Sequence, residues 1–520
     1  MRFQAKPEWA GACDSREAAA EAPCAKTIVV CHDDLAKRTN RNSRMKILLV
    51  APHFPPRHFG GVEFYTKRLA DYLRATGDSP EVMCAERIDA DAPAFDAVRD
   101  TTFGYPVHRL SFNASTEADA FKASYHSAAV EAWTTRLLEA VRPDVVHLHS
   151  GYLLGGAVLS AARHREIPTV VTLHDFWFVC ARIILLKPNG TRCSGPDSAA
   201  KCAWCLATEQ RRFRLPDAAS GGRLGRVVIK ALAHPHVAAV TGWSPAISAL
   251  SDRTAALRDA LMHASLVLAP SRFLRDLMVQ TGLPADRVVI SRLGIDVPIP
   301  KPRIIPDESD LRIGYLGQLA PHKGVDVLVE ALRWLPGAPL RVRIYGDPHS
   351  HAGYAEELQR LSGGDPRITF HGAYRHEHVY DLLAGLDAIV VPSVCYENAP
   401  LVIQEAQAAH VPVLASRLGG MRELVTDEHD GLLFDPGNPQ DLARQLRRLL
   451  EEPSLLERLR PDGTSVRTEA DEMRELSAHY QRLARNTAES DHQSLATAHR
   501  EGSTSPTVLA PLLLNQSSDR

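Results

Sequence analysis

The chain has 520 residues, 45% of them hydrophobic and 23% charged, a composition typical of a globular protein with two or three domains. Its net charge of −2 excludes a global field that would attract nucleic acid or acidic polymers. No apolar run reaches the roughly 18 residues of a membrane span, the N-terminus lacks the apolar core of a secretory signal, and nine cysteines cannot all pair, so we expect a cytoplasmic, reduced protein.

The first half of the chain alternates strand and helix patterns. Residues 1–44 lack periodicity and are expected to be a disordered extension, because Met45–Ala51 begins a buried strand and looks like a natural protein start. A mis-chosen start codon would explain such an extension. Strands are predicted at Val145–Leu148, Thr169–Leu173, Leu266–Ala269 and Val288–Ser291, with helices at Gly61–Leu73 and Tyr125–Ala140. Such alternation predicts a parallel sheet covered on both faces, which we assign to a Rossmann-like domain over residues 45–298.

A proline-rich linker, DVPIPKPRIIPDESD at residues 296–310, separates this unit from a second one. Strands are then predicted at Leu311–Leu316, Leu340–Tyr345, Ile368–Phe370, Ala388–Val391 and Val411–Ala415, with helices at Val325–Trp334, Tyr354–Leu361 and Pro400–Ala409. We expect a second Rossmann-like domain over residues 311–455, C-terminal helices over 456–487 and a disordered tail over 488–520. Two doubly wound α/β units that face each other predict a ligand cleft between them.

Two acids stand close together in PSVCYENAPLVIQEA, residues 392–406, after the buried strand Asp387–Val391. We expect Asn398 to cap the following helix and Pro400 to lie in its first turn, with Glu397 in the loop before it and Glu405 about two turns into it. A carboxylate accepts hydrogen bonds from neighbouring hydroxyls, and a helix N-terminus suits a diphosphate, so this pattern fits a nucleotide-sugar. It also fits a loop glutamate followed by a solvated helical one.

A candidate phosphate loop, GQLAPHKGVD at residues 317–326, follows the strand Leu311–Leu316. Gly317 allows a ligand to approach the backbone, and Lys323 precedes a helix N-terminus, where its charge favours phosphate. The loop is not a Walker A motif. A glycine and a lysine by themselves fit an ordinary loop equally well.

The order of several motifs resembles that of the retaining GT-B glycosyltransferases of family 4. The first domain carries PPRHFGGVE (55–63), PDVVHLH (143–149) and VVTLHD (170–175), and the second carries the loop at 317–326, ENAPLVIQE (397–405), GGMRE (419–423) and DGLL (430–433). The resemblance runs from about residue 45 to residue 485. It implies an N-terminal acceptor domain and a C-terminal nucleotide-sugar-binding domain.

This resemblance implies a hexosyltransferase that moves a sugar from a UDP-, GDP- or ADP-sugar to an acceptor hydroxyl with retention, by front-face attack and without a divalent metal or other cofactor. The implied acceptors are glycans or lipid-linked intermediates of surface polysaccharide or glycolipid synthesis. The implied catalytic residues are His174, Lys323 and Glu397. The implied donor-binding residues are Gly60, Gly61, Gly317, Gln318, Lys323, Glu397, Asn398 and Glu405.

One residue departs from the family pattern, because Gln318 stands where members usually carry arginine. An amide donates a hydrogen bond but supplies no charge. Arg57, His322 and Arg422 are the candidates to replace that charge. The departure keeps a non-catalytic nucleotide-sugar-binding protein open as an alternative, beside a same-fold epimerase or phosphorylase.

Two other patterns bear on metal ions. The triplet Asp89-Ala90-Asp91 could hold a divalent ion on a diphosphate, but we expect it to be solvated surface. Cys180, Cys193, Cys202 and Cys205 fall within 26 residues, with the spacing C-x12-C-x8-C-x2-C, in an insertion assigned to residues 176–220. Four such thiolates could complete a structural zinc site; free thiols, an occasional disulfide and an iron–sulfur cluster remain alternatives.

A local basic stretch follows the cysteines, and apolar residues are interspersed among its charges: Leu224, Val227, Val228, Ile229 and Leu232. Its basic residues are Arg211, Arg212, Arg214, Arg223, Arg226 and Lys230. An amphipathic basic helix would rest on an anionic membrane, which here would be the inner face of the cell membrane. A solvated helix over the first domain fits the pattern equally well.

Overall fold

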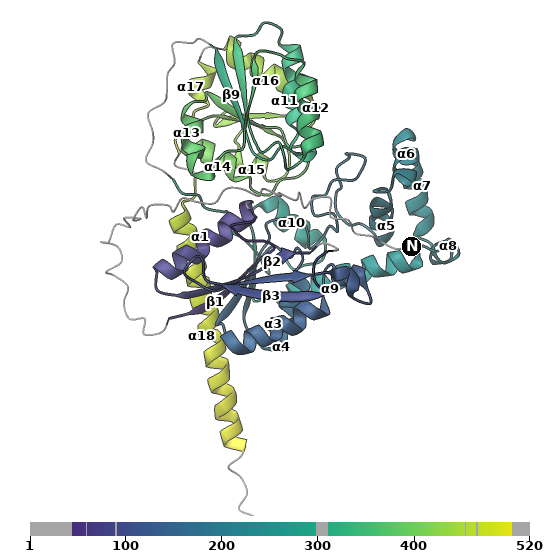
Figure 1. Cartoon of the computed structure of the whole chain (residues 1–520), viewed down its shortest axis with the longest axis vertical. Helices are drawn as coiled ribbons and strands as arrows, with labels where there is room; N and C mark the ends of the chain where they lie inside the picture. The colour runs from purple at the N-terminus through teal and green to yellow at the C-terminus, as the bar shows by residue number, and fades with distance from the viewer. Residues whose placement is uncertain are drawn as a thin grey trace, which may run out of the picture.

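A computed structural model describes residues 44–58, 60–88, 91–297, 310–452, 454–463 and 466–501, with side chains to residue 486. Residues 1–43 of the expected extension, residues 298–309 of the predicted linker, Asp89-Ala90 and the end of the expected tail lie outside these ranges. The described chain forms two units, each built on a largely parallel sheet (Figure 1), as the predicted fold class requires.

The first sheet has eight strands in the order β3-β4-β2-β1-β5-β6-β7-β8. The strands are β1 (Lys46–Ala51), β2 (Ser79–Arg87), β3 (Phe95–Asp100), β4 (Val107–Phe112), β5 (Val145–His149), β6 (Thr169–Thr172), β7 (Leu266–Ala269) and β8 (Val288–Ile290). All neighbours are parallel except the edge pair β3–β4. Strands β2, β3 and β4 were not predicted, because charged residues interrupt them. In β4, for example, the buried Arg109 is paired with Asp100 and Glu86.

The second sheet has six parallel strands in the order β11-β10-β9-β12-β13-β14. They are β9 (Leu311–Leu316), β10 (Leu340–Tyr345), β11 (Ile368–Gly372), β12 (Ala388–Val391), β13 (Val413–Ser416) and β14 (Gly431–Phe434). The strand order reverses between β9 and β12. Ligands of open α/β sheets bind outside the carboxyl ends of the strands at such a switch point. The loops that follow β9 and β12 are the two that carry Lys323 and Glu397.

Helices cover both sheets. Those of the first domain are α1 (Gly61–Ala75), α2 (Ala120–Ala123), α3 (Ala128–Val141), α4 (Gly155–His164), α9 (Ser244–His263) and α10 (Arg272–Gln280), with α5 (Ala199–Ala207), α6 (Arg211–Ala219), α7 (Arg223–Leu232) and α8 (Pro235–Val240) in the insertion. The remaining helices are α11 (Val325–Ala331), α12 (Ala352–Ser362), α13 (Val379–Ala384), α14 (Leu401–Ala408), α15 (Met421–Leu424), α16 (Pro439–Glu451), α17 (Leu455–Arg458) and α18 (Glu469–Glu501). No helix in these described ranges is long and apolar enough to span a bilayer.

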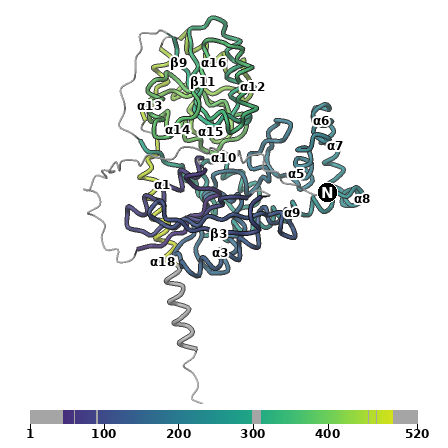
Figure 2. Tube along the Cα trace, viewed as in Figure 1, coloured from purple at the N-terminus to yellow at the C-terminus, as the bar shows by residue number. Residues whose placement is uncertain are grey.

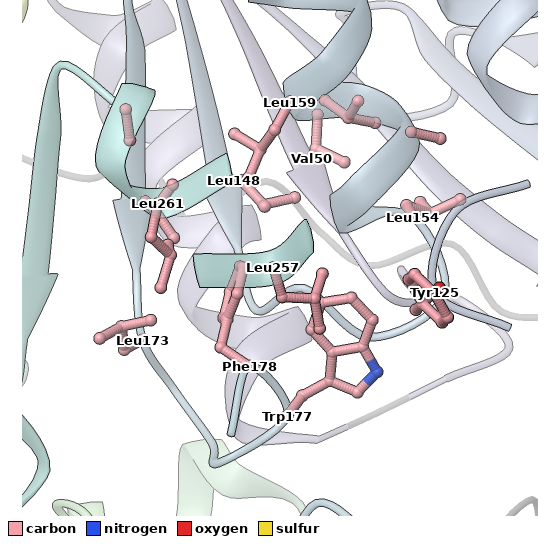
Figure 3. Packing of buried hydrophobic residues seen from close by; sticks show 14 of the residues in the cluster. Val50, Tyr125, Leu148, Leu154, Leu159, Leu173, Trp177, Phe178, Leu257 and Leu261 are labelled. Atoms are coloured by element: carbon pink, nitrogen blue, oxygen red, sulfur yellow. The ribbon is translucent and has the colours of Figure 1, made fainter. Parts of the chain in front are cut away.

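The alternation of side chains along β1 builds a core on each face of the first sheet. Leu48 and Val50 belong to one buried cluster, and Ile47 and Leu49 belong to the other, because successive side chains of a strand point to opposite faces. Figure 3 shows Val50 and Leu148 in the first of these cores, with Leu257 of α9 and the aromatic side chain of Trp177.

The long helix α18 returns from the second domain and lies along the first (Figures 1 and 2). Its Met473, Leu476 and Tyr480 are buried in the core that also contains Ile47. Beside Gly294, the outgoing and returning segments are paired, since Ile295 N–H donates to Arg467 O (3.1 Å) and Glu469 N–H donates to Ile295 O (2.8 Å). The helix runs beyond residue 488, the predicted start of the tail, because neither proline nor glycine interrupts it.

The insertion has a small core of its own. Trp204 of α5 and Leu232 of α7 are buried with Trp243, which precedes α9. The insertion therefore extends to the start of α9 rather than ending near residue 220. It projects to the side of the first domain (Figure 1).

The docking of α18 depends in part on a buried hydrogen bond between Tyr480 Oη and His147 Nδ1 (2.5 Å). We expect Tyr480→Phe to lower the free energy of unfolding by about 1–2 kcal/mol, because a buried imidazole nitrogen loses its partner. Urea denaturation followed by circular dichroism measures this. Tyr380→Phe, which removes an exposed hydroxyl contact to Asp296 O, is the matched control and should change little. Equal stability of the wild type and Tyr480→Phe would contradict the described docking.

Candidate active site

The loops after β9 and β12 are locked against each other by backbone contacts. Gly324 has a φ of 68°, and a Cβ there would lie 2.2 Å from Pro392 O, so only glycine fits without displacement of the backbone. Val394 N–H donates to His322 O at 3.0 Å across the same gap. These contacts fix Lys323 beside Glu397.

Lys323 and Glu397 form a hydrogen-bonded ion pair, with Nζ 2.7 Å from Oε1. Ser393 Oγ donates to the same oxygen at 3.0 Å. Burial acts against both charges, but the attraction between them outweighs it, so the pKa of Lys323 is raised and the pKa of Glu397 is lowered. Both groups are therefore charged at neutral pH. Their side chains remain 28% and 17% exposed, and the ammonium group has further N–H donors for an anion.

The motif Gly419-Gly420 supports the back of the Glu397 loop. Gly420 N–H donates to Glu397 O at 2.7 Å, and a Cβ on Gly420 would lie 1.6 Å from Asn398 O. Any side chain there would push Glu397 and Asn398 out of place. The glycines thus act through packing on the neighbouring loop.

The first domain contributes the segment after β6. Burial lowers the pKa of His174 to about 3, so its imidazole is neutral, and its Nε2 lies 3.4 Å from His149 Nδ1. Asp175 accepts hydrogen bonds from Ser150 Oγ (2.5 Å) and from Trp177 N–H (2.8 Å), and burial raises its pKa. These contacts hold an imidazole and a carboxyl group at the end of the strand.

The two domains enclose a cavity of about 110 Å³. Four predicted site residues line it: His174, Lys323, Glu397 and Asn398. Its other lining residues are Asp175, Phe176, Ile183, Ile184, His322, Cys395 and Tyr396. An ammonium group, a carboxylate and a neutral imidazole thus face one space, which suits a ligand that carries both hydroxyls and negative charge.

Direct contacts join the domains around this cavity. Asn398 Nδ2 donates to His174 O at 2.9 Å. Glu423 of α15 accepts from the backbone N–H groups of Arg272 (2.8 Å) and Phe273 (2.6 Å), the first residues of α10, so one domain caps a helix of the other. Phe273 also stacks on Tyr396, with ring centroids 4.8 Å apart.

The prediction that Asn398 caps α14 is wrong. The helix begins at Leu401 after Pro400, without a side-chain cap, and Glu405 lies one turn into it rather than two. The amide of Asn398 is instead used by the other domain, and its buried Oδ1 lacks a hydrogen-bond partner among the described residues. Sequence periodicity could not reveal a partner 224 residues away.

Glu405 lies apart from the cavity, where α14 faces α1. Its side chain is 5% exposed, and its Oε1 lies 3.4 Å from His376 Nε2. The His376 ring is stacked 5.6 Å from the ring of Phe64 on α1. Burial raises the pKa of Glu405 to about 7, although the positive charge of Arg68 acts to lower it. Glu405 thus lies at a second place where the two domains meet, apart from the cavity that contains Lys323 and Glu397.

The predicted glycines and Gln318 do not line the cavity either. Gly60 and Gly61 open α1 as expected, but the carboxyl group of Glu63 is turned back and accepts from the backbone N–H of Gly60. Gly317 lies at the end of β9, where its N–H donates to Tyr345 O (3.0 Å), and Gln318 is exposed.

None of the three candidates to replace the missing arginine adds a charge to this cavity. Arg57 is paired with Glu86 (3.0 Å), and Arg422 is exposed and is not among the lining residues. His322 lines the cavity, but burial and the charge of Lys323 lower its pKa to about 4. Among the described lining residues, Lys323 is the one lysine or arginine.

Two residues of the site were not singled out from the sequence. Asp175 belongs to the VVTLHD segment, but its hydrogen bonds to Ser150 and Trp177 become visible only in the fold. Tyr396 lies next to Glu397, and its stacking on Phe273 depends on the other domain. The position directly after a buried strand was the available signal for Asp175.

The four clustered cysteines line a separate, smaller cavity in the insertion. In the described part of the chain, no three His, Cys, Asp or Glu side chains form a ready set of metal ligands. The cysteines therefore share one space without a preformed coordination geometry.

Two family models match this chain. Glycosyltransferase Family 4 matches residues 59–298, and Glycosyl transferases group 1 matches residues 310–452. A GDP-mannose-dependent alpha-mannosyltransferase of Mycobacterium tuberculosis is 26% identical over 399 residues, which are 76% of this chain and 84% of that protein. A D-inositol 3-phosphate glycosyltransferase of Rhodococcus erythropolis is 26% identical over 412 residues, which are 77% and 80% of the two proteins.

Solved structures share the fold. A sucrose-phosphate synthase of Thermosynechococcus elongatus has a TM-score of 0.57 at 20% identity, over 87% of this chain and 100% of that one. Anabaena HepE in complex with UDP and glucose has a TM-score of 0.54 at 19% identity, over 84% and 100%. The two matched family models together span both sheets and the loops that enclose the cavity, and the chain accordingly belongs to the group 1, family 4 glycosyltransferases, with the GT-B fold.

Proposed function

We propose that this glycosyltransferase moves a hexose from a nucleoside diphosphate sugar to an acceptor hydroxyl with retention of configuration and without a divalent metal. The observation that carries the proposal is the charged pair of Lys323 and Glu397, which faces the neutral His174 across a cavity lined by both domains. A cation, an acid and a neutral hydrogen-bonding group are what such a donor requires.

Lys323 would act on the leaving group. As the bond between the anomeric carbon and the diphosphate breaks, negative charge grows on the phosphate oxygen, and a nearby ammonium group lowers the barrier. The acceptor oxygen attacks the same face of the sugar, and its proton passes to the departing phosphate. No protein nucleophile is needed in this route. Lys323 is the one lysine or arginine among the described lining residues, so within the cavity it would carry this task.

Glu397 and His174 would orient the sugar. The Glu397 carboxylate accepts hydrogen bonds from sugar hydroxyls while Lys323 keeps it ionised. The neutral imidazole of His174 can accept or donate one hydrogen bond without repelling the positive charge that develops on the sugar ring. Asn398, whose Oδ1 lacks a described partner, offers a further acceptor at the same cavity.

Glu405 would hold the ribose of the donor, at the second position between the domains. The two ribose hydroxyls can both donate to one carboxylate. The Gly60–Gly61 backbone would receive the diphosphate between these positions, once Glu63 turns away from the N-terminus of α1.

The nucleotide and the acceptor are proposals by analogy with the relatives. The mycobacterial relative is named for GDP-mannose, and HepE was solved with UDP and glucose, so GDP- and UDP-hexoses are the first donors to test. We propose glycan or lipid-linked acceptors, in synthesis of a cell-surface polysaccharide or glycolipid.

The decisive assay measures release of UDP or GDP with and without candidate acceptors, and the anomeric configuration of the product by NMR. Acceptor-dependent release with retention, at a rate independent of added Mg²⁺ or Mn²⁺, supports the proposal. Release without transfer, tight donor binding without turnover, inversion, or a metal requirement would each contradict it. These outcomes also separate the transferase from an epimerase, a phosphorylase and a non-catalytic binding protein.

Lys323→Ala should lower kcat about 100- to 1000-fold, because the leaving diphosphate loses its cation. Lys323→Arg should retain more activity than Lys323→Ala. Exposed Lys122→Ala is the control and should match the wild type. Activity of Lys323→Ala within threefold of the wild type would remove Lys323 from the mechanism.

Donor affinity should rise about tenfold from pH 6 to pH 8, because Glu405 has a pKa of about 7 without ligand and must be ionised to accept from ribose. Below pH 7 the carboxyl group must first lose a proton, which weakens binding, and above pH 7 this cost disappears. Calorimetry in buffers of different ionisation enthalpy would detect the released proton. Glu405→Gln should bind more weakly and lose the pH dependence; a pH dependence retained in Glu405→Gln would rule out this role.

We also propose that α6 and α7 bring the acceptor side to an anionic membrane. Leu224 and Val227 are exposed on α7 beside Arg223 and Arg226, while Leu232 of the same helix is buried in the insertion core. An apolar strip flanked by positive charge suits an acidic lipid surface.

A vesicle cosedimentation assay tests this surface. The wild-type chain should bind vesicles that contain phosphatidylglycerol and release them at high salt, and the double variant Leu224→Asp and Val227→Asp should bind much less. Val98→Asp, an exposed position on the edge strand β3, is the control. Equal binding by the double variant and the control would exclude the α7 surface.

A further inference from the structure

The insertion gathers four cysteines from three separate pieces of chain. Cys180 follows the aromatic segment that includes Trp177 and Phe178, which are anchored in the core of the first domain (Figure 3). Cys193 follows a short bridge between Leu186 and Arg192. Cys202 and Cys205 lie one turn apart on α5, so they share a face of that helix.

All four cysteines line one cavity of about 30 Å³. That volume holds an object about the size of a water molecule. The other lining residues are seven with no polar side-chain group, Val179, Ala181, Leu185, Leu186, Gly195, Pro196 and Leu206, and three cationic ones, Arg182, Lys187 and Lys201. Thiols that converge on a small apolar space have few polar partners there, which suits a thiophilic ion better than a water cluster.

A buried cation beside the cluster provides an independent indication. The Arg253 side chain on α9 is buried, lies 5.1 Å from the Trp177 ring centroid and donates to Trp177 O at 2.5 Å. Within the described ranges, no salt bridge joins its guanidinium group to a carboxylate, although Asp175, Cys180 and Cys202 are all near enough to act on its charge. A buried guanidinium is stabilised by negative charge nearby, and neutral thiols supply none.

We propose that Cys180, Cys193, Cys202 and Cys205 bind a structural zinc ion. Binding would convert four thiols and Zn²⁺ into a tetrahedral tetrathiolate with a net charge of 2− and would release four protons. The product would add negative charge beside Arg253, which already interacts with Asp175. Four thiolates fill the tetrahedron and leave no position for substrate or water, so the ion has no part in catalysis.

The thiols must turn to reach this geometry. Cys193 Sγ is now directed at Gly195 O, at 3.4 Å, as a neutral thiol donor. The cysteines come from loops and one short helix, whose side chains rotate readily once an ion replaces the thiol protons. Coordination would tie the loops to α5 and thereby fold the insertion onto the first domain.

The zinc would also shape the active site, an extension that rests on the proposed function. Ile183 and Ile184 lie between Cys180 and Cys193 in sequence and line the cavity that contains Lys323 and Glu397. Coordination of Cys180 and Cys193 would therefore hold Ile183 and Ile184 in place at the wall of the active-site cavity. Loss of the ion should therefore weaken acceptor use before it affects donor binding, because the donor residues are mostly on the second domain.

The test uses the full chain, purified under reducing conditions without a metal-affinity tag from cells supplied with zinc. Elemental analysis should find about one zinc per chain. Cys202→Ser and Cys180→Ser should each lower the zinc content at least tenfold, and Cys84→Ala, a buried cysteine of β2 outside the cluster, should keep it. Donor binding by Cys202→Ser, measured separately, distinguishes loss of the ion from failure of the proposed transferase function.

A second measurement remains informative if a serine variant does not fold. Cobalt exchanged into the wild-type chain should give intense thiolate-to-cobalt charge-transfer bands and tetrahedral d–d bands, and addition of a thiol-reactive mercurial should release one metal ion as four thiols react. Absence of stoichiometric metal, iron in place of zinc, a disulfide among the four cysteines, or a cobalt spectrum without thiolate bands would each overturn the proposal.

Discussion

Lys323 and Glu397 are 74 residues apart in sequence and 2.7 Å apart in the fold. Their contact exists because the strand order reverses between β9 and β12, so that two loops leave neighbouring strands at the same edge of the sheet. Gly324 and Gly420 then hold these loops at distances that a Cβ would not permit. Each charge stabilises the other in a partly buried place, which keeps both ionised without a ligand.

The first domain forms the other wall of the cavity, with His174 and Asp175. Burial keeps the imidazole of His174 neutral and raises the pKa of Asp175, whose carboxyl group accepts hydrogen bonds from Ser150 Oγ and Trp177 N–H. Among the described lining residues, the first domain thus contributes hydrogen-bonding groups and no lysine or arginine, whereas the second domain contributes the ion pair. The Glu423 cap on α10 and the Asn398 bond to His174 O hold the two sides together.

Most apolar strands were predicted from runs of consecutive apolar residues, although the buried strand β14 was not. The predicted bounds of β7, β9, β10 and β12 agree with the structure residue for residue. Strands β2 and β4 escaped prediction, since buried polar groups such as Arg109 find partners that only the fold reveals. The site residues likewise fall into those that the sequence indicated and those that only the fold reveals. Motif order indicated Lys323, Glu397 and His174, while the true partner of Asn398 and the separate burial of Glu405 depend on the neighbouring domain.

The chain crosses between the domains twice beside Gly294, and the two crossing segments are paired there by backbone hydrogen bonds. Tyr380, whose hydroxyl donates to Asp296 O, and Arg68, which is paired with Glu469, add contacts close to this crossing. Both side chains also interact electrostatically with Glu405. The part of the interdomain surface that holds Glu405 is therefore tethered by the same segments that connect the two domains.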